Sequence, residues 1–134
     1  MQFVIDSNVY IFAFGPSNEY KAFDFLSNLL DNTHLHSIRI PRTIFEEVKR
    51  NISPETFPEF STFIHELTSV DEDIIVPFEI AFKYETIGFK PADAFIAAYT
   101  EWVGADALVT ENRHFMTLHS GLPLFFYIFL TLIS

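Results

Sequence analysis

FVIDSN, at residues 3–8, is the stretch from which the architecture of this chain is first inferred. Its three leading residues are apolar and two of them are β-branched, which predicts a short strand buried on both faces. The apolar run stops at Asp6, so this carboxylate should stand at the carboxyl end of a central strand, where ligands and metals collect in open α/β sheets. Asp6-Ser7-Asn8 is equally typical of an N-cap that opens a helix, and the rest of the chain must decide between these two interpretations.

Length and composition limit the classes of protein to consider. The 134 residues predict a single domain over residues 1–134. No cysteine is present, so any metal would be held by oxygen or imidazole, and a reducing, cytoplasmic environment is expected. A formal net charge of −10 argues against a protein that coats nucleic acid, but not against an enzyme that reaches phosphate through divalent ions. The first residues show no signal-peptide pattern.

Amphipathic helices and short apolar strands alternate along the rest of the chain. Helical patterns are expected at residues 9–14, 17–32, 42–52, 57–67, 80–87 and 91–103. A short strand is expected at 38–40, and a short strand or extended segment at 74–76. A second central strand is expected at residues 107–110, and its carboxyl end should present Thr110, Glu111 and Asn112. This repeats the pattern at Asp6, with polar oxygens following a buried strand.

Two adjacent glutamates on the helix at 42–52 should face different ways. The apolar stripe of this helix consists of Ile44, Phe45, Val48 and Ile52. Glu46 lies well away from the stripe, whereas Glu47 lies near its border, so Glu47 is the better candidate for a ligand. The alternative is that both are surface glutamates favoured near a helix N-terminus.

Asp93 follows Pro91 in the opening turn of a helix that is otherwise almost wholly apolar. The helix dipole alone could account for a carboxylate in this turn. An aspartate on so apolar a helix nevertheless needs a partner, and a metal shared with Asp6 would be one. Two other candidates are set aside: the acidic run at residues 71–73 is expected to face water, and His114 is expected to be a loop histidine rather than a ligand.

Four motifs, taken in order, resemble the PIN domain, the fold of VapC-type toxin ribonucleases. They are Val-Ile-Asp-Ser-Asn-Val at 4–9, Phe-Glu-Glu-Val at 45–48, Pro-Ala-Asp-Ala-Phe-Ile-Ala-Ala at 91–98, and Gly-Ala-Asp-Ala-Leu-Val-Thr-Glu-Asn-Arg-His-Phe at 104–115. The resemblance covers the chain up to about Leu118. It implies an α/β protein, a three-layer α/β/α sandwich with a mainly parallel central sheet.

The resemblance also implies a function. Asp6, Glu47 and Asp93 match the first three acids of the family, which bind Mg²⁺ or Mn²⁺ and hydrolyse RNA. Asn112 falls where many members have a fourth aspartate and others have Asn, and Ser7 matches a hydroxyl position beside the metal. The expected protein is therefore a metal-dependent endoribonuclease, the toxin of a toxin–antitoxin pair, with an RNA substrate and a cognate antitoxin as partner.

Two alternatives to this function come from other classes of protein. A non-catalytic PIN-like module that binds RNA or protein would be consistent with Asn112 in place of an aspartate. A phosphoacceptor domain of the receiver type also places Asp at strand ends, but it needs a second acid beside Asp6 and a lysine after its last strand. No acid adjoins Asp6 and no lysine follows Lys90, so the receiver interpretation is disfavoured.

The C-terminal tail departs most from the family pattern. Residues 122–133 carry no charge and are almost entirely hydrophobic. As a helix, about twelve residues would reach only ~18 Å, short of the ~30 Å hydrocarbon core, so no membrane span is expected. One or two buried strand segments that close the sheet are expected instead.

The tail leads to a prediction about oligomeric state. Large apolar side chains at residues 124–130 each gain about 1.5–3 kcal/mol on full burial, and a peripheral strand can bury only one face within its own chain. We therefore expect a homodimer with an apolar contact through the tail. Truncation after Gly121, followed by measurement of mass in solution, should convert a dimer to a monomer. A protein that is monomeric and equally soluble with and without the tail would contradict this expectation.

Overall fold

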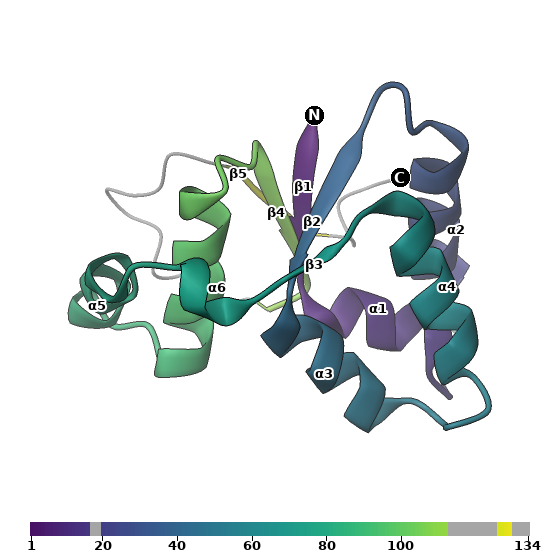
Figure 1. Ribbon diagram of the computed structural model, residues 1–134, viewed down its shortest axis with the longest axis horizontal. Helices are drawn as coiled ribbons and strands as arrows, with labels where there is room; N and C mark the ends of the chain where they lie inside the picture. Colours follow the sequence, from purple (N-terminus) through teal and green to yellow (C-terminus); the bar gives the residue numbers. More distant parts are fainter. Residues whose placement is uncertain (17–19, 113–125, 130–134) are drawn as a thin grey trace.

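The computed structural model describes residues 1–16, 20–112 and 126–129 of the chain. The described strands form one sheet in the order β3-β2-β1-β4-β5, and every neighbouring pair is parallel (Figure 1). The strands are β1 (Gln2–Ile5), β2 (Ser37–Pro41), β3 (Val70–Asp71), β4 (Ala107–Thr110) and β5 (Phe126–Phe129). The parallel sheet expected from the sequence is therefore confirmed.

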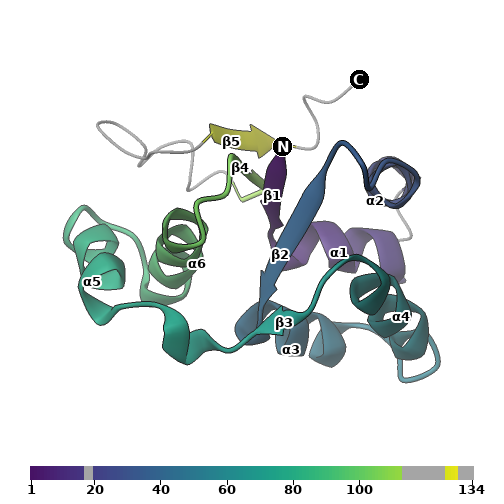
Figure 2. The same cartoon turned by 45° about the horizontal axis from the view of Figure 1, so that its top comes forward.

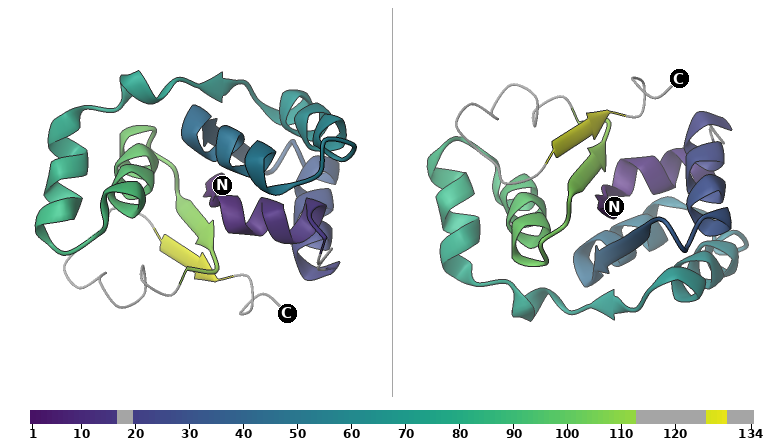
Figure 3. Two further views of the ribbon diagram at one scale, coloured as in Figure 1. Left: turned by 90° about the horizontal axis from the view of Figure 1, so that it is seen from below. Right: turned by 90° about the horizontal axis from the view of Figure 1, so that it is seen from above.

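Helices cover both faces of this sheet. They are α1 (Ser7–Phe14), α2 (Tyr20–Asp31), α3 (Arg42–Asn51), α4 (Phe57–Leu67), α5 (Phe78–Thr86) and α6 (Pro91–Trp102), with a short 3₁₀ helix η1 (Asp73–Ile75) after β3. Figures 2 and 3 show α5 and α6 on one side of the sheet and α1 to α4 on the other. The expected three-layer α/β/α sandwich is thus confirmed. Among the described residues, no helix is long and apolar enough to cross a membrane.

The two central strands are buried on both faces, as their short apolar runs predict. Val4 and Ile5 in β1, and Leu108 and Val109 in β4, are fully buried. Alternation of apolar and polar residues is not needed in such strands, because helices cover the sheet on both sides. The core is therefore built outward from β1 and β4.

The strand order creates a crevice at the carboxyl end of β1. From β1 the chain moves through β2 to β3 at one edge, and it then returns to β4 on the other side of β1. Loops that leave β1 and β4 consequently diverge, and such a switch point is where open α/β sheets bind ligands. Asp6 follows β1 and Thr110 ends β4, so both lie at this crevice.

The strand or extended segment predicted at residues 74–76 is wrong for Ile74 and Ile75, whereas Val76 has an extended backbone. Residues 74–76 are not a strand: β3 ends at Asp71, and η1 occupies Asp73–Ile75. Ile74 is 91% exposed, so the short apolar run does not mark burial here. The physical reason is tertiary, because the Asp73 carboxylate accepts a hydrogen bond from the Thr43 backbone N–H at 3.0 Å and turns the chain toward α3.

Some of the remaining predicted segments lie partly outside the described residues. The helices predicted from 42, 57 and 91 are present within a few residues of the expected bounds. Ser17, where the second helix is expected to begin, and most of the C-terminal tail lie outside the described residues. Within the tail, β5 pairs with β4 at the edge of the sheet, as expected for a closing strand (Figure 2). The homodimer stays a prediction.

Tyr10 provides a stability prediction for the core. Its side chain is fully buried, and its hydroxyl has no hydrogen-bond partner among the described residues. Burial raises the pKa of this phenol above its ordinary value. Tyr10→Phe removes an unpaired polar atom and should raise the free energy of unfolding by about 1 kcal/mol, or the Tm by about 4 °C.

Tyr84 is the matched control for this change. It is equally buried, but its hydroxyl donates to Glu101 Oε1 at 2.8 Å. Tyr84→Phe should therefore lower stability by about 1 kcal/mol. Thermal unfolding of both variants checks the pair. A Tyr10→Phe variant that is destabilised as much as Tyr84→Phe would show that the Tyr10 hydroxyl does have a partner.

Candidate functional site

A cavity of about 380 Å³ opens at the carboxyl ends of the central strands, and it gathers all four predicted site residues. Asp6, Glu47, Asp93 and Asn112 line it. They come from the end of β1, from α3, from α6 and from the segment after β4. The fold therefore brings together residues that are far apart in the sequence.

Asp6 is the buried centre of this cavity. Its Oδ1 accepts a hydrogen bond from the Ser7 backbone N–H at 2.8 Å, and its Oδ2 accepts one from the Thr110 hydroxyl at 2.8 Å. Burial raises the pKa of the Asp6 carboxyl, the two hydrogen bonds oppose this rise, and the nearby charges of Asp93 and Glu47 add to it. Asp6 is thus both the N-cap of α1 and a member of an acidic cavity, so the two interpretations of its motif are compatible.

Asp93 and Asn112 contact each other within the cavity. The Asn112 Nδ2 donates to Asp93 Oδ1 at 3.3 Å, and the Asn112 backbone N–H donates to the Thr110 Oγ1 at 2.9 Å. Thr110 therefore contacts both Asp6 and Asn112. An aspartate at position 112 would instead bring a second carboxylate against Asp93, so the amide reduces repulsion in the absence of a cation.

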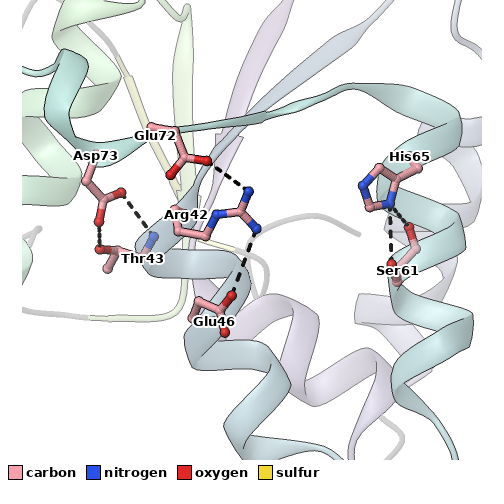
Figure 4. Close-up of polar contacts among 7 residues, drawn as sticks. All are labelled: Arg42, Thr43, Glu46, Ser61, His65, Glu72 and Asp73. Atoms are coloured by element: carbon pink, nitrogen blue, oxygen red, sulfur yellow. Dashed lines mark hydrogen bonds and ion pairs between the residues drawn. The ribbon is translucent and has the colours of Figure 1, made fainter.

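The two glutamates of α3 have the different orientations that the helical pattern predicts. Glu47 lines the cavity, together with Thr43 one turn earlier on the same helix face. The Glu46 side chain is 41% exposed, and its Oε1 lies 3.9 Å from Arg42 Nη1 on the outside of the helix (Figure 4). Glu47 is therefore the glutamate placed toward Asp6.

The residues around the cavity suit a hard cation held partly through water. Among residues 1–16, 20–112 and 126–129, no three acidic or histidine side chains are arranged to hold a metal ion directly. Mg²⁺ commonly binds through one or two carboxylates and keeps several of its waters, so carboxylates spread around a cavity of this size fit its chemistry. The donors are all oxygens, which a hard cation prefers.

Arg42, Lys49, Arg50 and Arg113 are the cations nearest in sequence to the site residues, and a basic rim formed by them would guide an RNA strand, although a solvated helix surface is an equally good explanation for each one. Two of the three that the structure describes are engaged by other groups. Arg42 pairs with Glu72 at 2.9 Å, and Lys49 lies over the Phe57 ring, 5.2 Å from its centroid. Arg50 is exposed at the end of α3, and Arg113 lies outside the described residues. A guiding role for these cations therefore stays a prediction.

Some residues of the site were missed by the sequence analysis. Thr43 and Asn8 also line the cavity. Thr43 could have been found, because it stands four residues before Glu47 on the same face of one helix. The expectation that residues 71–73 face water holds for Glu72 but is wrong for Asp71 and Asp73, whose carboxylates accept hydrogen bonds from Arg39, Tyr99 and Thr43. No local pattern signals those partners, which lie on other elements.

Two other cavities adjoin each other between α1, α2 and α4, with volumes of about 500 and 220 Å³. Aromatic and aliphatic side chains such as Phe14, Phe23 and Leu26 form much of their walls. Glu59 lines both of them, and Glu66 lines the smaller. Of these three cavities, the one that gathers Asp6, Glu47 and Asp93 is the candidate functional site, because carboxylates around one space can bind a divalent cation.

Comparison with solved structures identifies the architecture. The chain matches a chain of VapBC2 from Rickettsia felis, whose crystal structure was determined bound to a DNA fragment from the promoter, with a TM-score of 0.69 and 17% identity. The match covers 96% of this chain and 98% of that chain. The fold is PIN-like. No protein-family model matches the sequence, and comparison with curated proteins finds no match. The PIN-like fold expected from the four motifs is confirmed by this structural match.

Removal of the Asp6 charge should stabilise the metal-free protein. The pKa of Asp6 is raised above its ordinary value of 3.8 in the folded state, so stability is lost as pH rises from 3.8 through the raised pKa. Asp6→Asn keeps an acceptor for the Ser7 N–H and abolishes this loss. In chelator at pH 8, we expect a gain in unfolding free energy on the order of 1 kcal/mol, which shrinks toward pH 4.

Two variants serve as controls in thermal unfolding across this pH range. Asp106→Asn changes a carboxylate that accepts from the Gln2 N–H at 2.7 Å outside the cavity, and it should show no comparable gain. Asp6→Ala removes the N-cap acceptor as well as the charge, and it should lose about 1 kcal/mol relative to Asp6→Asn. If Asp6→Asn were destabilised as much as Asp6→Ala, the prediction would be wrong, because the charge of the carboxylate and not its capping oxygen would then stabilise the metal-free protein.

Proposed function

We propose that this chain is a metal-dependent endoribonuclease that hydrolyses RNA phosphodiester bonds, with Mg²⁺ or Mn²⁺ as cofactor. The observation that carries the proposal is that Asp6, Glu47 and Asp93, from three separate elements, line one cavity at the switch point of the sheet. Asn112 completes the set of oxygen donors. Such a cavity concentrates negative charge in a partly buried space, which a divalent cation would neutralise.

Each residue has a defined part in this proposal. The carboxylates of Asp6, Glu47 and Asp93 and the amide oxygen of Asn112 would hold the ion. When bound, a divalent ion polarises a phosphoryl oxygen and lowers the pKa of a bound water. The Ser7 N–H and the Thr110 hydroxyl fix the orientation of the Asp6 carboxylate through their two hydrogen bonds. The Asn112 amide does the same for Asp93.

We also propose that a protein antitoxin controls this activity in the cytoplasm. Support comes from the structural match to a chain of the VapBC2 complex, a similarity of fold. The alternative function is a non-catalytic PIN-like module that binds RNA or protein. It is favoured by the amide at Asn112, and by the absence, among the described residues, of three acidic side chains arranged to hold a metal directly.

Cleavage of single-stranded RNA tests the proposal. Purified full-length protein should cleave RNA with Mn²⁺ or Mg²⁺ and should be inactive in chelator. Glu47→Gln should lower the cleavage rate by about 100-fold or more, the scale seen when one charge-stabilising group is removed from an active site.

Glu46→Gln is the matched control, because it makes the same chemical change one residue away on the outer face of α3. It should cleave within about twofold of the unchanged protein. Cleavage that persists in chelator, or equal losses in Glu46→Gln and Glu47→Gln, would rule out the proposed site. Metal-independent RNA binding without cleavage would favour the non-catalytic module.

A further inference from the structure

The segment at residues 71–73 contacts both helices that carry predicted metal ligands. Asp71 ends β3, and Asp73 begins η1, at the edge of the sheet beside β2. From there, Asp73 contacts α3, which carries Glu47, and Asp71 contacts α6, which carries Asp93. One short segment is therefore joined to two walls of the cavity.

Asp73 supplies the cap that α3 lacks in its own sequence. Pro41 occupies the N-cap position of α3 and makes no side-chain capping bond. Asp73 accepts the Thr43 backbone N–H at 3.0 Å, and its other carboxylate oxygen accepts the Thr43 hydroxyl (Figure 4). The negative charge at a helix N-terminus is also favoured by the helix dipole. The start of α3 is thus fixed from a position 30 residues away.

Asp71 joins α6 to β2. Its Oδ2 accepts Arg39 Nε at 2.9 Å and the Tyr99 hydroxyl at 2.6 Å, and Arg39 Nη2 lies 2.8 Å from the same oxygen. Only 19% of the Asp71 side chain is exposed, so these charge-assisted bonds are shielded from water. Arg39 belongs to β2 and Tyr99 to α6, so the Asp71 carboxylate fixes the helix relative to the sheet.

We propose that Asp71 and Asp73 are positioning residues that set the places of Asp93 and Glu47 relative to Asp6. The proposal rests on the proposed metal-dependent function. Thr43, held by Asp73, lines the same cavity as Glu47 one turn farther along α3. A helix is rigid over one turn, so an error in the orientation of its first turn is passed directly to Glu47. Metal ligands must be held within about 0.5 Å of the productive geometry.

Glu72 differs from its two neighbours although it lies between them. Its side chain is 61% exposed, and its carboxylate pairs with Arg42, whose side chain is 39% exposed. A surface ion pair of this kind contributes little to stability or orientation. Glu72→Ala therefore removes the same charge from the same segment without removing a buried contact to α3 or α6, and it is the matched control.

The test measures the affinity of full-length protein for Mn²⁺ by titration calorimetry. Asp73→Ala and Tyr99→Phe should each weaken Mn²⁺ binding by about 10–100-fold, the usual cost of losing a group that orients a ligand. Asp73→Asn keeps an acceptor for the Thr43 N–H and should stay within about threefold of the unchanged protein. Glu72→Ala should stay within about twofold. Thermal unfolding identifies any variant that is not folded.

These measurements distinguish failure of the positioning role from failure of the proposed function. A folded variant that binds Mn²⁺ like the unchanged protein overturns the positioning role of the contact it removes, because a purely structural contact changes Tm and not affinity. If the unchanged protein itself fails to bind Mn²⁺, the proposed function fails instead. Crystal structures of Asp73→Ala and Tyr99→Phe then decide the positioning role: a displaced Glu47 or Asp93 supports it, and side chains at their original places overturn it.

Discussion

The burial of one ionisable carboxylate at the end of β1 is the constraint on which the rest of the site depends. Asp6 is 9% exposed, and its two oxygens accept from the Ser7 N–H and the Thr110 hydroxyl. These bonds make its burial tolerable, because a buried polar group without partners would be costly. They also join β1, α1 and β4 at one point. The order of the strands therefore places the buried Asp6 carboxylate at the switch point of the sheet.

Three helix N-termini meet this concentration of charge. Ser7 and Asn8 begin α1, Thr43 lies in the first turn of α3, and Asp93 lies in the first turn of α6, and all four line the cavity. Each N-terminus carries a partial positive charge that favours nearby anions. The helices therefore offset part of the repulsion among the carboxylates. A bound divalent cation would offset the remainder and would stabilise the folded state through its binding energy.

The three helices differ in how their first backbone N–H groups are capped. Asp6 caps α1 locally, whereas Asp73 reaches α3 from another element, and the N-cap residue of α6, Lys90, makes no side-chain capping bond. The local cap is visible in the sequence as Asp6-Ser7. The tertiary cap is not, and the segment that contains it is an acidic run of the kind that usually faces water. This is why Asp71 and Asp73 were misjudged while Asp6 was not.

The sequence by itself determined the alternation of helices with short strands, the two central strands near residues 3–5 and 107–110, and the choice of Asp6, Glu47 and Asp93 as candidate ligands. These features follow from local apolar runs and helical periodicity, which depend on neighbouring residues. The three-layer sandwich and the role of Asn112 came instead from the resemblance to the PIN domain. Only the tertiary structure decided the Thr110 bond to Asp6, 104 residues apart, and the Asp73 bond to Thr43, 30 residues apart. The 3₁₀ turn at Asp73–Ile75 was decided in the same way. The physical reason is that a side-chain hydrogen bond depends on which elements the fold places side by side, and no local pattern contains that information.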